Sequence, residues 1–162
     1  MTWSPDGQTV VVSNRSDLIT HIDVRSQRVT RTVRSQHECN EAAFSHDGAL
    51  LMTALDGTVS VARWPSMEEV SRVGVSPVAT IAMDLDPRGR YLAAGSNDAT
   101  VSLWETQEFT CVRSVGHHDD PLRTCRFSHD GQFLATSVGD GTGIIIVSRN
   151  SLRHPWPPLE SC

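Results

Sequence analysis

The sequence predicts an all-β protein assembled from about four copies of one structural unit. A five-residue turn motif occurs four times and ends each time in a glycine, at Gly7, Gly48, Gly89 and Gly131. These glycines are spaced by 41, 41 and 42 residues, and two short apolar runs follow each motif. No run has the apolar i, i+3, i+4, i+7 pattern of an amphipathic helix. A steady period with strand and turn content indicates a repeat architecture.

The third copy shows most clearly how the unit is built. Residues 85–89 (Leu-Asp-Pro-Arg-Gly) predict a tight turn, because proline presets φ and glycine accepts a positive φ. Residues 91–95 and 100–104 predict two strands, and the second ends in Trp104-Glu105. This pair is a variant of the Trp-Asp dipeptide that ends a strand in WD40 blades. The sequence therefore predicts a WD40 β-propeller with about four blades present, as part of a seven-bladed propeller.

The predicted blades follow one another as residues 1–36, 37–75, 76–116 and 117–148, and residues 149–162 form an irregular tail that contains prolines. The predicted strands are residues 2–4, 8–13, 18–24, 28–34, 39–44, 50–53, 58–63, 68–73, 78–85, 91–95, 100–104, 109–115, 122–127, 133–137 and 143–147. In this assignment the first blade has only the end of its inner strand, and the fourth has no outer strand. An incomplete arc of blades exposes apolar end faces. We therefore expect the isolated chain to self-associate, to need a partner or to aggregate.

A dense basic run lies in the predicted outer strand of the first blade. The chain contains no lysine, and four of its fourteen arginines are Arg25, Arg28, Arg31 and Arg34. They could bind RNA phosphates or an acidic partner. Alternatively, their charge protects an exposed strand from edge-to-edge pairing, and we favour this second interpretation. Strict alternation would place Val29, Arg31 and Val33 on one face of the strand.

Four side chains of a WD blade can form a buried hydrogen-bonded tetrad. They are a histidine before the inner strand, a serine or threonine of the second strand, an aspartate of the next turn and the tryptophan; such a set stabilises only when every member is satisfied. The third blade has the last three members but no histidine, and the fourth has isoleucine in place of tryptophan. We assign structural roles within the blades to Trp104, Asp98, Ser96, His117 and Asp140.

No residue pattern in the chain predicts catalysis, a cofactor or a metal. The sequence has no P-loop, no Gly-x-Ser-x-Gly and no His-Glu-x-x-His motif. Its four cysteines lack metal-type spacing. The net charge of −5 argues against unspecific nucleic-acid binding. No apolar run approaches the roughly 20 residues that cross a bilayer, and the N-terminus shows no signal-peptide pattern. We expect an intracellular protein without membrane contact or a small-molecule substrate.

Function in propellers is located on exposed loops, and here those loops carry mostly acidic and amide side chains. The candidate partner-binding rim comprises Glu38, Asn97, Asp119, Asp120 and Arg123. This composition is more typical of a protein-recognition surface than of a nucleic-acid groove.

Several runs resemble the family of THO complex subunit 3. They are residues 101–105 (Val-Ser-Leu-Trp-Glu), 111–113 (Cys-Val-Arg), 121–124 (Pro-Leu-Arg-Thr) and 127–131 (Phe-Ser-His-Asp-Gly). The resemblance implies a non-enzymatic scaffold subunit of the nuclear THO/TREX assembly, which links transcription and mRNA processing to mRNA export. Its partners would be other protein subunits, with RNA contact indirect or weak. The alternatives are a WD40 scaffold of a chromatin or ubiquitin-ligase complex and, least favoured, an enzyme built on a propeller.

Overall fold

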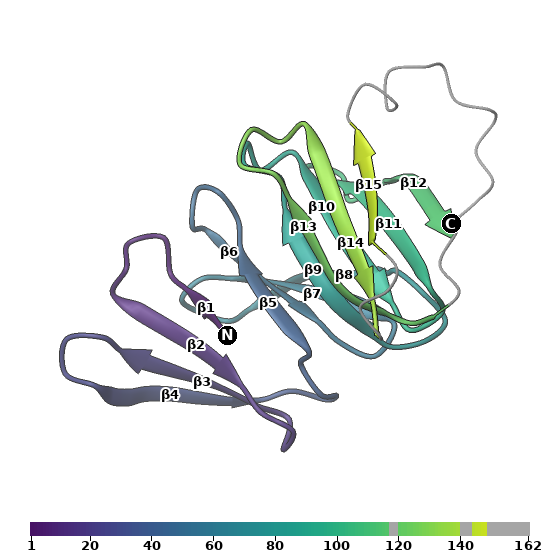
Figure 1. The fold of residues 1–162 in the computed structure, drawn as a ribbon. Coiled ribbons are helices and arrows are strands. Elements are labelled where there is room, and N and C mark those ends of the chain that lie inside the picture. The colour runs from purple at the N-terminus through teal and green to yellow at the C-terminus, as the bar shows by residue number, and fades with distance from the viewer. Residues whose placement is uncertain (117–119, 140–143, 149–162) are drawn as a thin grey trace. The chain divides into compact units, whose positions relative to one another are not determined.

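The computed structural model describes residues 1–116, 120–139 and 144–148, which consist of β-strands and turns (Figure 1). The predicted all-β class is confirmed, because these residues form four antiparallel sheets. Every predicted strand begins and ends within two residues of the observed one. The chain divides into two compact units, Met1–Thr80 and the part that begins at Ile81. No helix of the described residues is suited to crossing a membrane.

The first unit contains two four-stranded sheets in which each strand pairs with the next along the chain. The first sheet comprises β1 (Thr2–Trp3), β2 (Thr9–Ser13), β3 (Leu18–Asp23) and β4 (Arg28–Arg34), and the second comprises β5 (Glu41–Phe44), β6 (Leu50–Ala54), β7 (Thr58–Arg63) and β8 (Glu69–Gly74). Between them lies an apolar core of Val11, Ile19, Cys39, Ala42, Leu51 and Leu55, with Phe44, Trp64 and Met67 packed against it.

The second unit repeats this arrangement. Its first sheet comprises β9 (Thr80–Leu85), β10 (Tyr91–Ser96), β11 (Thr100–Glu105) and β12 (Cys111–Gly116), and its second comprises β13 (Leu122–Phe127), β14 (Phe133–Val138) and β15 (Ile144–Ser148). The core between the two sheets is formed by Ala82, Ala93, Val101, Leu103, Leu122, Cys125, Leu134 and Val138. The predicted tail, residues 149–162, lies outside the described residues.

The repeated turn motif owes its form to one set of local hydrogen bonds. In the first copy Ser4 Oγ donates to Asp6 Oδ1 at 2.6 Å and accepts the backbone N–H of Thr9 at 2.9 Å. Asp6 Oδ1 also accepts the N–H of Gln8. The bond from Ser4 is the main cause of the lowered pKa of Asp6. The turn glycine, Gly7, has a φ of 68°, a conformation that glycine adopts without steric cost.

The other copies show which part of the motif the fold requires. The serine–aspartate bond recurs at 2.6 Å in Ser45 with Asp47 and in Ser128 with Asp130. The third copy has no serine–aspartate pair. Asp86 occupies the position of the serine and alone provides the acceptor that the pair provides in the other copies. Its single buried Oδ1 accepts the backbone N–H groups of Arg90 and Tyr91. The requirement is therefore an acceptor for the N–H groups that follow the turn, and either arrangement supplies one.

The predicted faces of the outer strand at residues 28–34 are wrong. Val29 pairs with Ile22 of β3, whereas Arg31 pairs with His21. Because successive residues of a strand point to opposite faces, Val29 and Arg31 lie on opposite faces of β4. The cause is a β-bulge at Thr30, where β4 contains one residue more than β3.

The burial of His21 could not be predicted from the repeat pattern. Its side chain is 3% exposed, and among the described residues its Nε2 has no hydrogen-bond partner. The ring lies against Trp64, with the ring centroids 4.8 Å apart, and Arg31 is its cross-strand neighbour on β4. Burial lowers the pKa of His21 from its usual 6.5, and the positive charge of Arg31 lowers it further.

We expect this histidine to make the fold sensitive to mild acid. In the unfolded chain His21 binds a proton near pH 6.5, whereas in the folded chain protonation is disfavoured, so stability falls as the pH drops below that value. Denaturant unfolding followed between about pH 5 and 8 measures the effect. His21→Gln should flatten the decline, and the exposed His46→Gln should leave it intact. Equal declines in the parent and His21→Gln would contradict the prediction.

Candidate interaction surface

Trp104 is buried as predicted, but its indole has a partner that the sequence did not indicate. The side chain is 7% exposed, and Nε1 donates to Ser102 Oγ at 2.8 Å. Ser102 lies two residues earlier on the same face of β11, and its partner in the neighbouring strand is Ala94, which has no hydroxyl group. The donor is therefore satisfied within its own strand, by a serine that is not one of the tetrad members.

The other predicted blade residues occupy different environments. Ser96 is buried at the end of β10, with 1% of its surface exposed. Asp98 is exposed, and its Oδ1 accepts the N–H and the Oγ1–H of Thr100, which holds the turn before β11. His117 and Asp140 lie outside the described residues, so their structural roles stay predictions.

The rim residues that the structure describes are all exposed: Glu38, Asn97, Asp120 and Arg123. Asp119 lies outside the described residues. In the second unit, Gly95 at the end of β10 packs against Leu122 at the start of β13, and a Cβ at Gly95 would lie 3.3 Å from Leu122 Cδ1. Asn97 follows Gly95 by two residues and Asp120 precedes Leu122 by two. The turn that contains Asn97 and the loop that contains Asp120 therefore lie at the same end of the two sheets.

Arg123 adds a cation to this end of the second unit. Its Nε lies 3.4 Å from the position that a Cβ would take at Gly139, which follows β14. Together, Asn97, Asp120 and Arg123 offer an amide, a carboxylate and a guanidinium on an exposed surface. Such a set can exchange hydrogen bonds with another protein. Glu38 belongs to the first unit and to the loop before β5.

The serines and aspartates of the turns form structural hydrogen bonds with one another. Ser45 and Ser128 donate their hydroxyl protons to the aspartates of their own turns. The adjacent His46 and His129 are exposed. Within the described residues, no group of three His, Cys, Asp or Glu side chains is placed to hold a metal ion. The thiol of Cys39 is buried, which raises its pKa and keeps it a poor nucleophile.

Two sheet faces expose apolar side chains. On the sheet of β13–β15, Phe133, Ile144 and Ile146 are 47%, 66% and 64% exposed, and the register places them on one face. On the sheet of β1–β4, Trp3 and Val29 are 57% and 61% exposed and flank the ladder formed by Val10 and Ile22. Sheet faces of this composition normally pack against another layer.

We expect the purified chain to self-associate through these faces. Exposed apolar patches on two sheets favour association. Sedimentation over a dilution series should show species larger than the monomer, and Ile144→Lys combined with Ile146→Lys should shift the distribution towards monomer. Val70→Lys is the matched control, because Val70 is 42% exposed on β8 and belongs to neither of the two sheets that carry these patches. A monomer at all concentrations would contradict this prediction.

Comparison with known proteins identifies the repeats. The family model described as "WD domain, G-beta repeat" matches residues 74–105 and 109–145. THO complex subunit 3 of Arabidopsis thaliana is 34% identical over 142 residues, which cover 86% of this chain and 45% of that protein. WD repeat-containing protein AAC3 of Dictyostelium discoideum is 31% identical over 135 residues, covering 79% of this chain and 28% of that protein. The chain thus spans less than half of the length of these curated relatives.

A solved structure supports the fold. A chain of Kuenenia stuttgartiensis hydrazine synthase superposes with a TM-score of 0.82, over 92% of this chain and 45% of that chain. The two sequences are 24% identical, so this similarity concerns the fold alone.

Proposed function

We propose that this chain, a protein with WD40 repeats, is a non-enzymatic scaffold subunit of a THO-type complex that acts in nuclear mRNA processing and export. The observation that carries the proposal is the similarity to THO complex subunit 3, which extends over both units of the chain. Fold similarity alone would not distinguish one WD40 protein from another, because one fold supports many functions.

The use of polar side chains supports a binding role. The Ser–Asp pairs of the turns and the indole of Trp104 are committed to hydrogen bonds inside the blades. The exposed polar side chains at the rim of the second unit remain available for a partner. We assign protein recognition to Asn97, Asp120 and Arg123, because an amide and two opposite charges on exposed loops suit a polar protein interface.

Co-purification from nuclear extract tests the proposal. The full-length tagged protein, expressed in its source cells, should be located in the nucleus and should recover the other THO subunits, which mass spectrometry identifies. Recovery of subunits of a chromatin or ubiquitin-ligase complex instead, without THO subunits, would contradict it. Catalytic turnover by the purified protein would contradict the non-enzymatic part.

Two variants locate the contact surface. Asp120→Arg combined with Arg123→Glu leaves the net charge unchanged and reverses the two charges of the rim. We expect it to reduce recovery of partner subunits. Arg88→Glu is the control, because Arg88 is an exposed arginine in the turn between β9 and β10 and is not a rim residue. If both variants retain their partners, the assigned rim is not the interface.

A further inference from the structure

The outer strand of the first sheet is a free β-sheet edge. β4 is seven residues long, pairs with β3 on one side and lies at the margin of its sheet (Figure 1). Among the described residues, no strand pairs with its other side. The Ser35 N–H donates to Asp17 O and so extends the ladder between β3 and β4. Because the N–H groups of a strand alternate in direction, those of Arg34 and Thr32 point outward.

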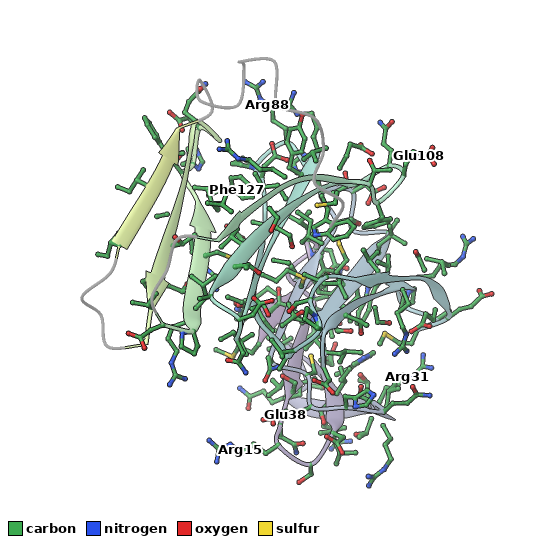
Figure 2. The ribbon with its side chains drawn as sticks, turned by 90° about the vertical axis from the view of Figure 1, so that its right-hand side faces the viewer. Arg15, Arg31, Glu38, Arg88, Glu108 and Phe127 are labelled. Carbon is green, nitrogen blue, oxygen red and sulfur yellow. The ribbon has the colours of Figure 1, made fainter. Side chains whose placement is uncertain are left out.

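This edge has a positive charge that no ion pair within the described part of the chain neutralises. Six of the seven side chains of β4 are exposed, including those of Arg28, Arg31 (Figure 2) and Arg34. Among the described residues none of these arginines forms an ion pair, and Arg31 donates from Nη1 to Pro65 O at 2.9 Å. Asp23, which pairs with Arg28 in the β3–β4 ladder, accepts two hydrogen bonds from Ser26.

The equivalent strand of the next sheet shows a different solution. β8 is also an edge strand, but its Arg72 forms an ion pair with Glu69 of the same strand at 2.6 Å. Glu69 also accepts the Ser60 hydroxyl at 2.6 Å. The charges on β8 are thus balanced. The charged residues of β4 are all arginines, although the chain as a whole has a net charge of −5. Balanced charges are enough to protect a strand edge from aggregation. The need for such protection therefore does not by itself explain the excess of positive charge on β4.

The arginines lie on both faces of the edge, and the bulge puts Arg28 on the same face as Arg31. Arg28 and Arg31 pair with Asp23 and His21, which share one face of β3, whereas Arg34 pairs with Leu18 on the other face. A polyanion that lies flat on a surface would need its cations on one face. A ligand strand that pairs with the edge has its own side chains on both faces of the sheet. Each of them would lie about 4.5–5.5 Å from the opposite side chain of β4, so the ligand would meet arginines on both faces. β4 also carries no aromatic side chain on which a base could stack.

We propose that the free edge of β4 binds an acidic, extended segment of a partner protein as an added strand. The outward N–H and C=O groups supply the backbone pairing, and the arginines on the two faces select acidic side chains. The exposed Val29 and the threonines of β4 provide contacts for the residues between them.

The test uses the full chain and a fluorescein-labelled peptide of sequence Glu-Thr-Val-Glu-Thr-Val-Glu, which has acidic residues on both faces of a strand. Fluorescence anisotropy should show saturable binding. A peptide of the same sequence with N-methylated backbone amides keeps the charge and loses the donors. It should bind at least about tenfold more weakly, because strand pairing depends on those donors.

Two double variants with the same change in net charge test whether binding depends on the arginines of β4 or only on the overall charge. Arg28→Glu combined with Arg34→Glu should weaken peptide binding by about tenfold or more. Arg88→Glu combined with Arg90→Glu changes the net charge equally at exposed sites in the turn between β9 and β10, and should change binding less than about twofold. If the first variant does not fold, Arg28→Gln combined with Arg34→Gln takes its place. Equal losses in the two double variants, equal affinity of the N-methylated peptide, or tighter binding of oligouridylate than of the peptide would overturn the proposal.

Discussion

Trp104→Ala is expected to lower the free energy of unfolding by about 3–5 kcal/mol, the usual range for removing an indole from a core. The side chain is 7% exposed and lies near the end of β11, where its cross-strand neighbour Leu92 is fully buried. Its removal would leave a cavity beside Leu92 and the Ser102 hydroxyl without its donor. Denaturant unfolding measures the loss. It should be done at one fixed protein concentration, since self-association makes stability depend on concentration.

Trp104→Phe distinguishes packing from hydrogen bonding. It keeps an aromatic ring in the core but removes the Nε1 donor and part of the volume of the indole, so we expect a cost of about 1–2 kcal/mol. Asp98→Ala should also cost less than Trp104→Ala, because the Asp98 side chain is exposed and supports the turn at Thr100. If Trp104→Ala unfolds at the same denaturant concentration as the parent, the indole does not contribute to the core.

The repeat could be predicted because its signals are local. A glycine at positive φ and an acceptor for the N–H groups after it define each turn, and both are visible in the motif around Gly7 and its three successors. The same holds for the strands, whose apolar runs are bounded by those turns. The prediction of Trp104 as a core residue also followed from its position at the end of an apolar strand.

What could not be predicted depends on pairing between strands. The bulge at Thr30 is a property of the β3–β4 ladder, and strict alternation along β4 therefore misplaced Arg31 relative to Val29. The partner of Trp104 was missed for a related reason, since the register places Ala94 opposite Ser102 and leaves the indole to a hydroxyl of its own strand. In the rim, only the packing of Gly95 on Leu122 shows that two separate loops share one end of their sheets.

Gly57→Ala is expected to cost about 3 kcal/mol or more, although it adds a single methyl group. Gly57 has a φ of 68°, where a residue with a Cβ loses about 1–2 kcal/mol. The added Cβ would lie 2.5 Å from the backbone oxygen of Ser76 and 3.3 Å from that of Val78. The segment after β8 is held there because Gly57 O accepts the N–H groups of Val75 and Ser76. Relieving the overlap would disturb those bonds, and overpacking of this kind adds a further 1–3 kcal/mol or so.

The corresponding turn of the third sheet provides a control in which we expect a substitution to increase stability. Ala99 precedes β11 as Gly57 precedes β7, and its φ is 65°. Ala99→Gly removes the conflict between the Cβ and the left-handed backbone, so we expect a gain of about 1 kcal/mol, reduced in part by the entropy of glycine in the unfolded chain. Unfolding midpoints of both variants, compared with that of the parent, test the pair. A Gly57→Ala variant as stable as the parent would mean that the segment at Ser76 does not rest on this turn. A loss limited to about 1–2 kcal/mol would mean that only the backbone conformation requires glycine.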